Sequence, residues 1–368
     1  MPSAVSGQAY PLRVPRSPAL ERRFPAARQR IPRWLSGGDG NRRRRRAPDP
    51  APAVLARVVP VLALLVLVLG WRRCAAPAAR EAPSALPQGE SAAAARDAAG
   101  APGAPRAAAI DPALQALVER LIDRDNGTTA VAVRHLRTGA SAAYHEQDVF
   151  PAASLAKVPV LVEVARRLET GAVRPDDPVR ITPDAITGGA GVLQARAGEE
   201  LAVVELMRLA VTVSDNVAAR LLLRHVGGVE AVNRTLAALG LEQTRLYADD
   251  RPNTTTAAEM AALLAGLAAR AETAPTRAGA PAPAAGTLAA LLALPQAQAW
   301  LAQGVPRGVP VAHKSGQLPN LRHDAGVVYA PRGPYVLVVL TDDLSDQDAA
   351  EAFVARLSRA VYEHFRSA

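Results

Sequence analysis

Cysteine and lysine are both scarce in this chain. The scarcity of cysteine bears on disulfide bonds, and that of lysine bears on the chemistry of the two lysines present. Cys74 is the single cysteine among 368 residues, which excludes a disulfide bond within the chain. The chain has 43 basic residues, but only Lys157 and Lys314 are lysines and the others are arginines. An ε-ammonium can lose its proton in a protein, whereas a guanidinium does not. A sequence that otherwise uses arginine therefore has a chemical reason to keep lysine where an amine must act as a base.

An excess of basic over acidic residues is missing from most of the chain, although the net charge of the whole chain is +9. Residues 1–110 contain 18 arginines and 6 acidic residues, which leaves residues 111–368 at a net charge of −3. The basic character thus belongs to the N-terminal part. We expect no nucleic acid as a partner of the remainder.

Two N-terminal segments lack the pattern of a folded domain. Residues 1–50 are rich in Arg, Pro and Ala and contain five consecutive arginines at 42–46, so we expect a disordered basic segment. We interpret the arginine run as an orientation signal for the apolar stretch that follows it, with a nucleic-acid-binding or lipid-binding arm as the alternative. Residues 74–109 are an Ala/Pro-rich linker.

Residues 51–73 separate these two segments and contain a charge-free apolar run at 58–71. The run is short for a bilayer span of about 20 residues, but the preceding Arg57 can snorkel and extend it. Because arginine is in excess before the run, we expect a single-pass, uncleaved transmembrane signal anchor. Residues 75–368 would then lie outside the cytoplasmic membrane. Cleavage of the segment and secretion of the remainder is the alternative.

Residues 110–368 are long enough for one large domain with a substantial core. Apolar spacing and capping residues predict helices at 111–123, 162–171, 200–211, 216–228, 229–240, 256–270 and 346–365. Alternating apolar residues predict strands at 128–136, 141–145, 309–316, 323–330 and 335–342, and 274–286 is expected to be a surface loop.

The order of these elements predicts an α/β (α+β) fold. We expect an antiparallel five-stranded sheet flanked by helices, with an inserted all-α subdomain between its second and third strands. The first and last helices are expected to cover the same face of the sheet.

Ser154 and Lys157 are three residues apart, in the sequence Ser-Leu-Ala-Lys. On a helix this spacing places both side chains on one face, about one turn apart. Serine is a poor nucleophile at its ordinary pKa and needs an adjacent base, which a lysine of lowered pKa provides. Chance occurrence in an Ala/Ser-rich helix is the alternative for this pattern taken alone.

Two further motifs weigh against chance. Lys314 begins Lys-Ser-Gly on an apolar strand, where Gly316 is expected to let a ligand approach the backbone closely. Ser-Asp-Asn at 214–216 lies between two predicted helices. The order S-x-x-K, S-D-N, K-S-G resembles the signature of class A β-lactamases and penicillin-binding proteins, which has K-T-G in last place.

The resemblance to class A β-lactamase-like serine hydrolases extends over nearly all of residues 110–368. It is carried by the segments FPAASLAKVPVL, VTVSDNVAARLLLRHVGG, LGLEQTRL, NTTTAAEMAALL and VAHKSG. The resemblance implies a β-lactamase/transpeptidase-like fold and an acyl-enzyme mechanism.

The resemblance also implies a role for each matching residue. Ser154 would be the acylated nucleophile and Lys157 would accept its proton. Ser214 would relay a proton toward the leaving nitrogen, and Asn216 would bind the side-chain amide of the substrate.

The K-S-G strand would bind the other end of the substrate. Lys314 and Ser315 would hold its carboxylate, and Lys314 would lower the pKa of Lys157 or Ser214. The backbone N–H groups of Ser154 and Gln317 would form an oxyanion hole, which is typically worth a few kcal/mol in the transition state.

The chain departs from the β-lactamases in the segment that supplies their deacylating Glu. The sequence Thr-Arg-Leu at 244–246 matches the family, but Asp250 stands where the Glu is expected. Only three residues then separate Asp250 from Thr254, so the loop is much shorter than in the lactamases. We expect Asp250 to act as the base in a slow deacylation, because its side chain is about one methylene shorter.

Three functions are compatible with these patterns. The first is a serine hydrolase of the class A β-lactamase type that hydrolyses β-lactams, and does so slowly. The second is a D,D-peptidase-like penicillin-binding enzyme acting on peptidoglycan stem peptides. The third is a non-catalytic wall-binding module.

We expect a monomer without cofactor or metal. The candidate metal ligands His313, His323 and Asp324 lack a further ligand at useful spacing, so we expect a structural role for them or a place at the edge of the site.

Overall fold

The structure is a computed structural model that describes residues 108–273 and 284–367, all within the compact unit Glu90–Ala368. The predicted segments 1–50 and 51–73, and nearly all of the 74–109 linker, lie outside the described residues. Within the described residues, no helix combines the length and the apolar character that a membrane crossing needs.

The central sheet has the strand order β1-β3-β2-β10-β9-β8. Its strands are β1 (Ala109–Ile110), β2 (Thr128–His135), β3 (Ala140–Tyr144), β8 (Val311–Leu318), β9 (Leu321–Ala330) and β10 (Gly333–Asp342). The five longer strands are antiparallel, as the sequence predicts. The two-residue β1 pairs parallel to the edge strand β3, so the sheet is mixed and has six strands.

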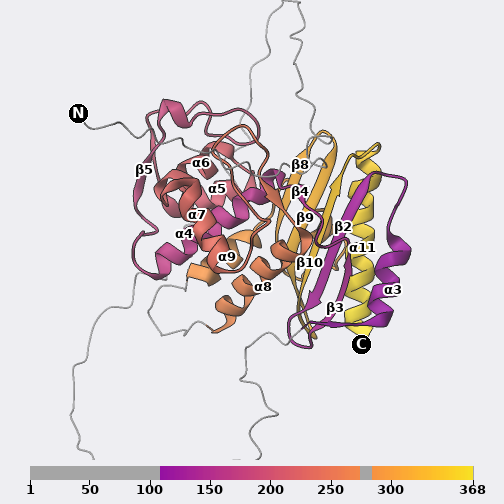
Figure 1. Cartoon of the computed structure of the whole chain (residues 1–368). Coiled ribbons are helices and arrows are strands. Elements are labelled where there is room, and N and C mark those ends of the chain that lie inside the picture. The colour runs from indigo at the N-terminus through magenta and orange to yellow at the C-terminus, as the bar shows by residue number, and fades with distance from the viewer. Residues whose placement is uncertain (1–107, 274–283, 368) are drawn as a thin grey trace, which may run out of the picture. The chain divides into compact units, whose positions relative to one another are not determined.

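Helices cover both faces of this sheet (Figure 1). One face packs against α3 (Pro112–Leu121), α10 (Trp300–Gln303) and α11 (Gln347–Ser367), as expected for the first and last predicted helices. The other face packs against α8 (Ala257–Thr273) and the helical insertion. Alternate residues of β10 belong to the two hydrophobic cores, because successive side chains of a strand point to opposite faces.

The inserted subdomain lies between β3 and β8. Its other helices are α4 (Lys157–Glu169), α5 (Val203–Thr212), α6 (Asn216–His225), α7 (Gly228–Ala238) and α9 (Ala284–Leu292), with the 3-10 turns η1 (Ala153–Ala156) and η2 (Pro183–Ala185). Two small sheets accompany them, formed by β4 (Phe150–Pro151) with β7 (Thr254–Thr255) and by β5 (Pro178–Arg180) with β6 (Glu200–Ala202). The sequence did not predict these strands, since two or three residues carry no detectable period.

The predicted loop 274–286 is corrected at its C-terminal end, where α9 begins at Ala284. Leu288 and Leu292 of α9 are buried in the core of the insertion, so tertiary packing stabilises this Ala-rich helix.

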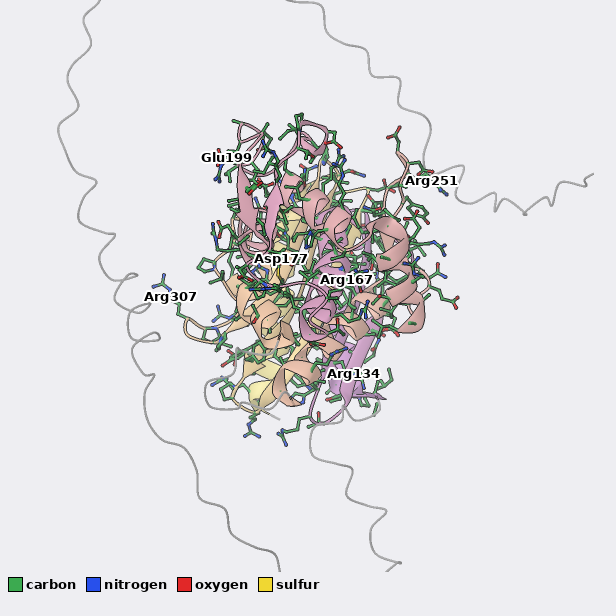
Figure 2. All side chains as sticks on the ribbon, turned by 90° about the vertical axis from the view of Figure 1, so that its left-hand side faces the viewer. Arg134, Arg167, Asp177, Glu199, Arg251 and Arg307 are labelled. Atoms are coloured by element: carbon green, nitrogen blue, oxygen red, sulfur yellow. The ribbon has the colours of Figure 1, made fainter. Side chains whose placement is uncertain are left out.

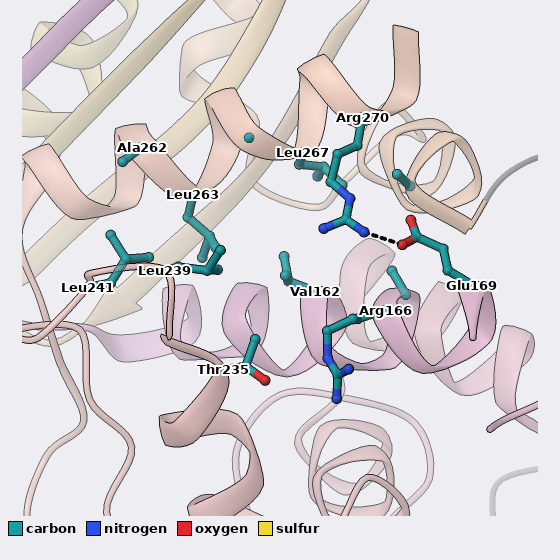
Figure 3. Close-up of a pocket in the computed structure, with 13 residues that line it drawn as sticks. Val162, Arg166, Glu169, Thr235, Leu239, Leu241, Ala262, Leu263, Leu267 and Arg270 are labelled. Atoms are coloured by element: carbon teal, nitrogen blue, oxygen red, sulfur yellow. Dashed lines mark hydrogen bonds and ion pairs between the residues drawn. The ribbon is translucent and has the colours of Figure 1, made fainter. Parts of the chain in front are cut away.

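An apolar pocket of about 150 Å³ lies between α4, α7 and α8 (Figure 3). Leu263 and Leu267 of α8 line it, and an ion pair between Arg270 and Glu169 lies at its edge. It shares no lining residue with the cleft described next.

Candidate active site

The turn η1 and the first turn of α4 place Ser154 beside Lys157. The Lys157 Nζ donates a hydrogen bond to the Ser154 Oγ at 2.8 Å. Ala153 adopts a left-handed backbone with φ of +46°, a costly conformation for a residue with a side chain.

Pro159 lies in the first turn of α4, where its missing N–H has no helical partner to lose. The proline therefore does not break the helix.

The Ser-Asp-Asn segment between α5 and α6 forms a second wall. The Ser214 Oγ donates to the Ser154 Oγ at 2.9 Å and accepts from the Lys157 Nζ at 3.1 Å. The Asn216 Oδ1 accepts a third hydrogen bond from the Lys157 Nζ, at 2.8 Å. Ser214 is also in the left-handed region, with φ of +53°. The sequence motifs S-x-x-K and S-D-N thus meet in space around one amine.

Asp215 holds this segment in place. Its buried carboxylate caps α6 by accepting from the Ala218 N–H at 2.9 Å, and it accepts from the N–H groups of Val192 and Leu193 at 2.6 and 3.0 Å. Gly191 lies against this carboxylate with φ of +129°, and an added Cβ would be 2.3 Å from the Asp215 Oδ2. The loop before α5 is therefore fixed to the active-site motif.

Strand β8 forms the third wall. Lys314 is 1% exposed, and its Nζ donates to the Ser315 carbonyl at 2.8 Å. A Cβ added to Gly316 would lie 3.3 Å from the His323 Cβ and 3.4 Å from the Ala152 carbonyl oxygen. The missing side chain of Gly316 lets the η1 turn and β9 pack closely against β8, and the close approach of a ligand expected from the sequence stays a prediction.

Both lysines have pKa values close to neutrality. Burial and, to a smaller extent, the nearby Lys314 cation lower the pKa of Lys157 to about 7, while Asp215 opposes the change. Burial also lowers the pKa of Lys314 to about 8, with Asp324 opposing. A large fraction of Lys157 is therefore a neutral amine at neutral pH, which is the state that a general base needs.

The hydrogen-bond count around Lys157 fits two protonation states. An ammonium has three N–H donors, and the three oxygens of Ser154, Ser214 and Asn216 accept them. A neutral amine has two N–H groups and a lone pair, which can accept the Ser154 O–H. Loss of one proton thus reverses the Lys157–Ser154 hydrogen bond and prepares the serine for attack.

These three walls enclose a cleft of about 440 Å³. It is lined by Ala153, Ser154, Ala156, Lys157, Val160, Thr187, Gly189, Ala190, Asn216, Ala219, Arg220, Leu223, Leu246, Asn253, Gln317 and Leu318. The sequence motifs did not indicate Arg220, Leu246 and Asn253 as residues of the site. Arg220 could have been predicted, because it follows Asn216 by four residues on a predicted helix and therefore lies on the same helix face.

Ser154, Lys157 and Ser214 are joined by hydrogen bonds, and Asp250 is the predicted catalytic residue that makes no such contact with them. It is exposed on the loop between Leu246 and β7 and is not among the residues that line the cleft. The next residue, Arg251, lies at the outer edge of the molecule (Figure 2). The deacylating role of Asp250 stays a prediction that this geometry does not support.

The two histidines near the site have structural partners. The His313 Nδ1 lies 2.8 Å from the Asp324 Oδ1. The His323 Nδ1 accepts from the Thr341 N–H, and its Nε2 lies 2.8 Å from the Pro151 carbonyl oxygen. Burial lowers the pKa of His323 to about 4, so its neutral ring ties the residues before η1 to the sheet. Within the described ranges, no three His, Cys, Asp or Glu side chains form a group able to hold a metal ion.

Serine enzymes that recognise penicillins share this arrangement of motifs, so the site places the chain in that class. Within that class, the model of the beta-lactamase enzyme family (Beta-lactamase2) matches residues 112–365. The chain belongs to this family and is a class A β-lactamase-like or PBP-A-like serine enzyme. The resemblance noted in the sequence is thereby confirmed.

Curated relatives include two bacterial β-lactamases. The chain is 30% identical to the β-lactamase of Rhodobacter capsulatus over 134 residues, which are 36% of this chain and 46% of that protein. It is 36% identical to the β-lactamase of Streptomyces fradiae over 159 residues, 42% of this chain and 50% of that protein. These matches span half or less of each relative.

Solved structures cover more of the domain. PBP-A is 26% identical, with a TM-score of 0.65 over 72% of this chain and 100% of its own. A PBP-A mutant with the same values was solved as an acyl-enzyme complex with penicillin G. A mutant of the last common ancestor of Gram-negative bacterial class A β-lactamases is 30% identical, with a TM-score of 0.60 over 69% of this chain and 98% of its own.

Proposed function

We propose that this protein forms an acyl-enzyme at Ser154 with β-lactams and hydrolyses it slowly. The observation that carries the proposal is the triangle of Ser154, Lys157 and Ser214, whose polar atoms lie 2.8 to 3.1 Å apart. A nucleophile, a base of pKa about 7 and a second hydroxyl within hydrogen-bond reach are the groups that acyl transfer requires.

Acylation follows from this geometry. The neutral amine of Lys157 accepts the Ser154 proton while the Oγ attacks the β-lactam carbonyl carbon. The carbon–nitrogen bond of the ring then breaks, and Ser214 donates its proton to the leaving nitrogen. The Lys157 ammonium returns a proton to Ser214, so the proton lost by Ser154 is balanced by the one gained by the nitrogen.

The remaining residues assigned to substrate binding are Asn216, which lines the cleft, and Lys314 and Ser315, which are buried on the strand whose Gln317 lines it. Lys314 and Ser315 hold the carboxylate of the substrate, and Asn216 holds its side-chain amide. The backbone N–H groups of Ser154 and Gln317 stabilise the oxyanion, a contribution of a few kcal/mol in comparable sites.

Slow hydrolysis is supported by the composition of the cleft. Hydrolysis of the ester needs a base that activates water. No Asp or Glu of the described residues lines the cleft. The apolar side chain of Leu246, which is 4% exposed, occupies part of the wall instead. The acyl-enzyme is therefore expected to accumulate.

The absence of Asp and Glu from the described lining of the cleft also favours a second candidate. This candidate is a D,D-peptidase-like enzyme that acts on peptidoglycan stem peptides and is inhibited by β-lactams. For such an enzyme β-lactams are slow inhibitors, which agrees with a cleft that no described Asp or Glu lines. The third candidate is a non-catalytic wall-binding module. It gains no support from the site, because Ser154, Lys157 and Ser214 are within hydrogen-bond distance of one another, as proton transfer requires.

Intact-mass spectrometry of the full-length protein with penicillin, together with hydrolysis of a chromogenic cephalosporin, tests the proposal. We expect a penicillin adduct on wild type that persists well beyond mixing, slow cephalosporin hydrolysis, and neither on Ser154→Ala. Rapid turnover without an adduct would show an efficient lactamase instead. An adduct without any cephalosporin hydrolysis would favour the peptidase, and no adduct on a folded protein would favour the binding module.

A further inference from the structure

Arg220 has no assigned role and lies on the wall of the cleft. It is exposed, and it follows Asn216 by four residues on α6, so the two side chains lie on the same face of the helix. Within the part of the chain that the structure describes, no hydrogen bond or ion pair engages its guanidinium. Its charge is therefore available to a ligand in the cleft.

Two other exposed arginines, Arg224 and Arg251, differ from Arg220 in having an acidic partner. On the next turn of α6, the Arg224 Nη1 lies 2.7 Å from the Asp184 Oδ2. On the loop beside the cleft, Arg251 pairs with Asp249 at 2.9 Å. Because those charges are neutralised and no described carboxylate lines the cleft, the cleft has a cationic wall at Arg220.

We propose that Arg220 binds a carboxylate on the acyl side chain of the substrate. The inference rests on the proposed function, in which Lys314 and Ser315 hold one carboxylate and Asn216 holds the side-chain amide. Residues four apart on a helix have Cβ atoms about 5–6 Å apart, so a group attached close to that amide comes within reach of Arg220.

The preferred substrate is thus a dianion, with a second carboxylate on the acyl side of the scissile bond. A guanidinium recognises a carboxylate through two parallel N–H···O bonds, which gives direction as well as charge. Both a β-lactam with an anionic side chain and a stem peptide with a free side-chain carboxylate meet this description.

Benzylpenicillin and carbenicillin are suitable probes, since their side chains differ by one carboxylate beside the amide carbonyl. The second-order acylation constant of each is measured by intact mass on the full-length protein, and the carbenicillin/benzylpenicillin ratio is compared between variants. We expect Arg220→Gln to lower this ratio about tenfold, the usual effect of losing a hydrogen bond to a charged group. High salt should lower the wild-type ratio toward that of Arg220→Gln, because exposed charges are screened.

Arg224→Gln is the matched control, because Arg224 is an exposed arginine on the same helix and is not among the residues lining the cleft. It should leave the ratio unchanged, and Arg220→Lys should restore part of it. A ratio that is the same in wild type and folded Arg220→Gln, with normal benzylpenicillin adducts, overturns this inference alone. Absence of any adduct on wild type overturns the proposed function and this inference together.

Discussion

Lys157 is the residue on which the chemistry of the site depends. Three acceptors, burial and the neighbouring Lys314 cation converge on its amine. Arginine at this position would keep the charge and lose the ability to take a proton. The scarcity of lysine in the sequence and the lowered pKa in the structure thus have the same chemical reason.

The first prediction concerns the pH dependence of acylation. Below pH about 7 Lys157 is protonated and cannot act as base, so the second-order acylation constant should rise as pH increases through about 7. Above pH about 8 Lys314 loses the charge that binds the substrate carboxylate, so the constant should fall again. Stopped-flow acylation at fixed ionic strength measures the profile.

Lys157→Arg is the control for this assignment, and it should not acylate at any pH while melting as a folded protein. A flat profile through the neutral range, or acylation of Lys157→Arg at the wild-type rate, would remove Lys157 from the role of general base.

The second prediction concerns Asp250. Because its carboxylate is exposed and outside the cleft lining, Asp250→Asn should change the lifetime of the penicillin adduct less than about twofold, a small effect beside the 100-fold that misplacing a catalytic group can cost. The lifetime is followed by intact mass after removal of free penicillin. A much longer lifetime with an unchanged acylation rate would show that the loop moves and that Asp250 is the base predicted from the sequence.

At the scale of elements, α4, α6 and β8 bring one motif each to the cleft, and backbone geometry fixes how closely they approach. Gly316 lets β8 pack against η1, and the capping carboxylate of Asp215 fastens the loop before α5 to the start of α6. The elements that hold the site are thus joined by contacts that do not involve a substrate.

The third prediction tests packing around α8. A Cβ added to Gly266, within this helix, meets no atom within 4 Å, and Gly266 is among the residues that line the apolar pocket between α4, α7 and α8. Gly266→Ala should therefore raise the free energy of unfolding by about 0.8–1.0 kcal/mol, the difference in helix propensity. Denaturant unfolding measures it.

Gly326→Ala in β9 is the contrasting variant, since its Cβ would lie 2.6 Å from the His313 Cβ and 2.8 Å from the Ala312 carbonyl oxygen. It should lower the free energy of unfolding. If Gly266→Ala destabilises the protein to a similar extent, the space beside α8 is not as open as the structure shows.

At the scale of the whole molecule, the chain divides by charge into an arginine-rich N-terminal part and a slightly acidic remainder that contains the family domain. An enzyme that meets β-lactams or peptidoglycan needs to work outside the cytoplasmic membrane. We therefore propose that the apolar segment 51–73 anchors the domain there, a proposal that rests on the arginine excess before it.

The fourth prediction follows from this topology. Protease added to intact spheroplasts of an expressing bacterium should remove the domain detected by an antibody against it, while a cytoplasmic marker protein survives. Protection of the domain until the membrane is broken would show the opposite orientation.

The sequence by itself determined the family, the five long strands and the three motifs, because each depends on local order: the period of apolar residues, and residue types at fixed spacing. Ser154 with Lys157, Ser214 with Asn216, and Lys314 with Ser315 were all identified from such spacing. The two- and three-residue strands could not be predicted, because they exist only by pairing with distant segments.

Only the tertiary structure decided what surrounds those motifs. Residues about 60 apart in the chain share hydrogen bonds with one lysine, and burial among them lowers its pKa. The same packing leaves Asp250 on the surface and turns Arg220 toward the cleft. Burial, charge proximity and the direction of a side chain depend on which elements meet, and a linear pattern does not contain that information.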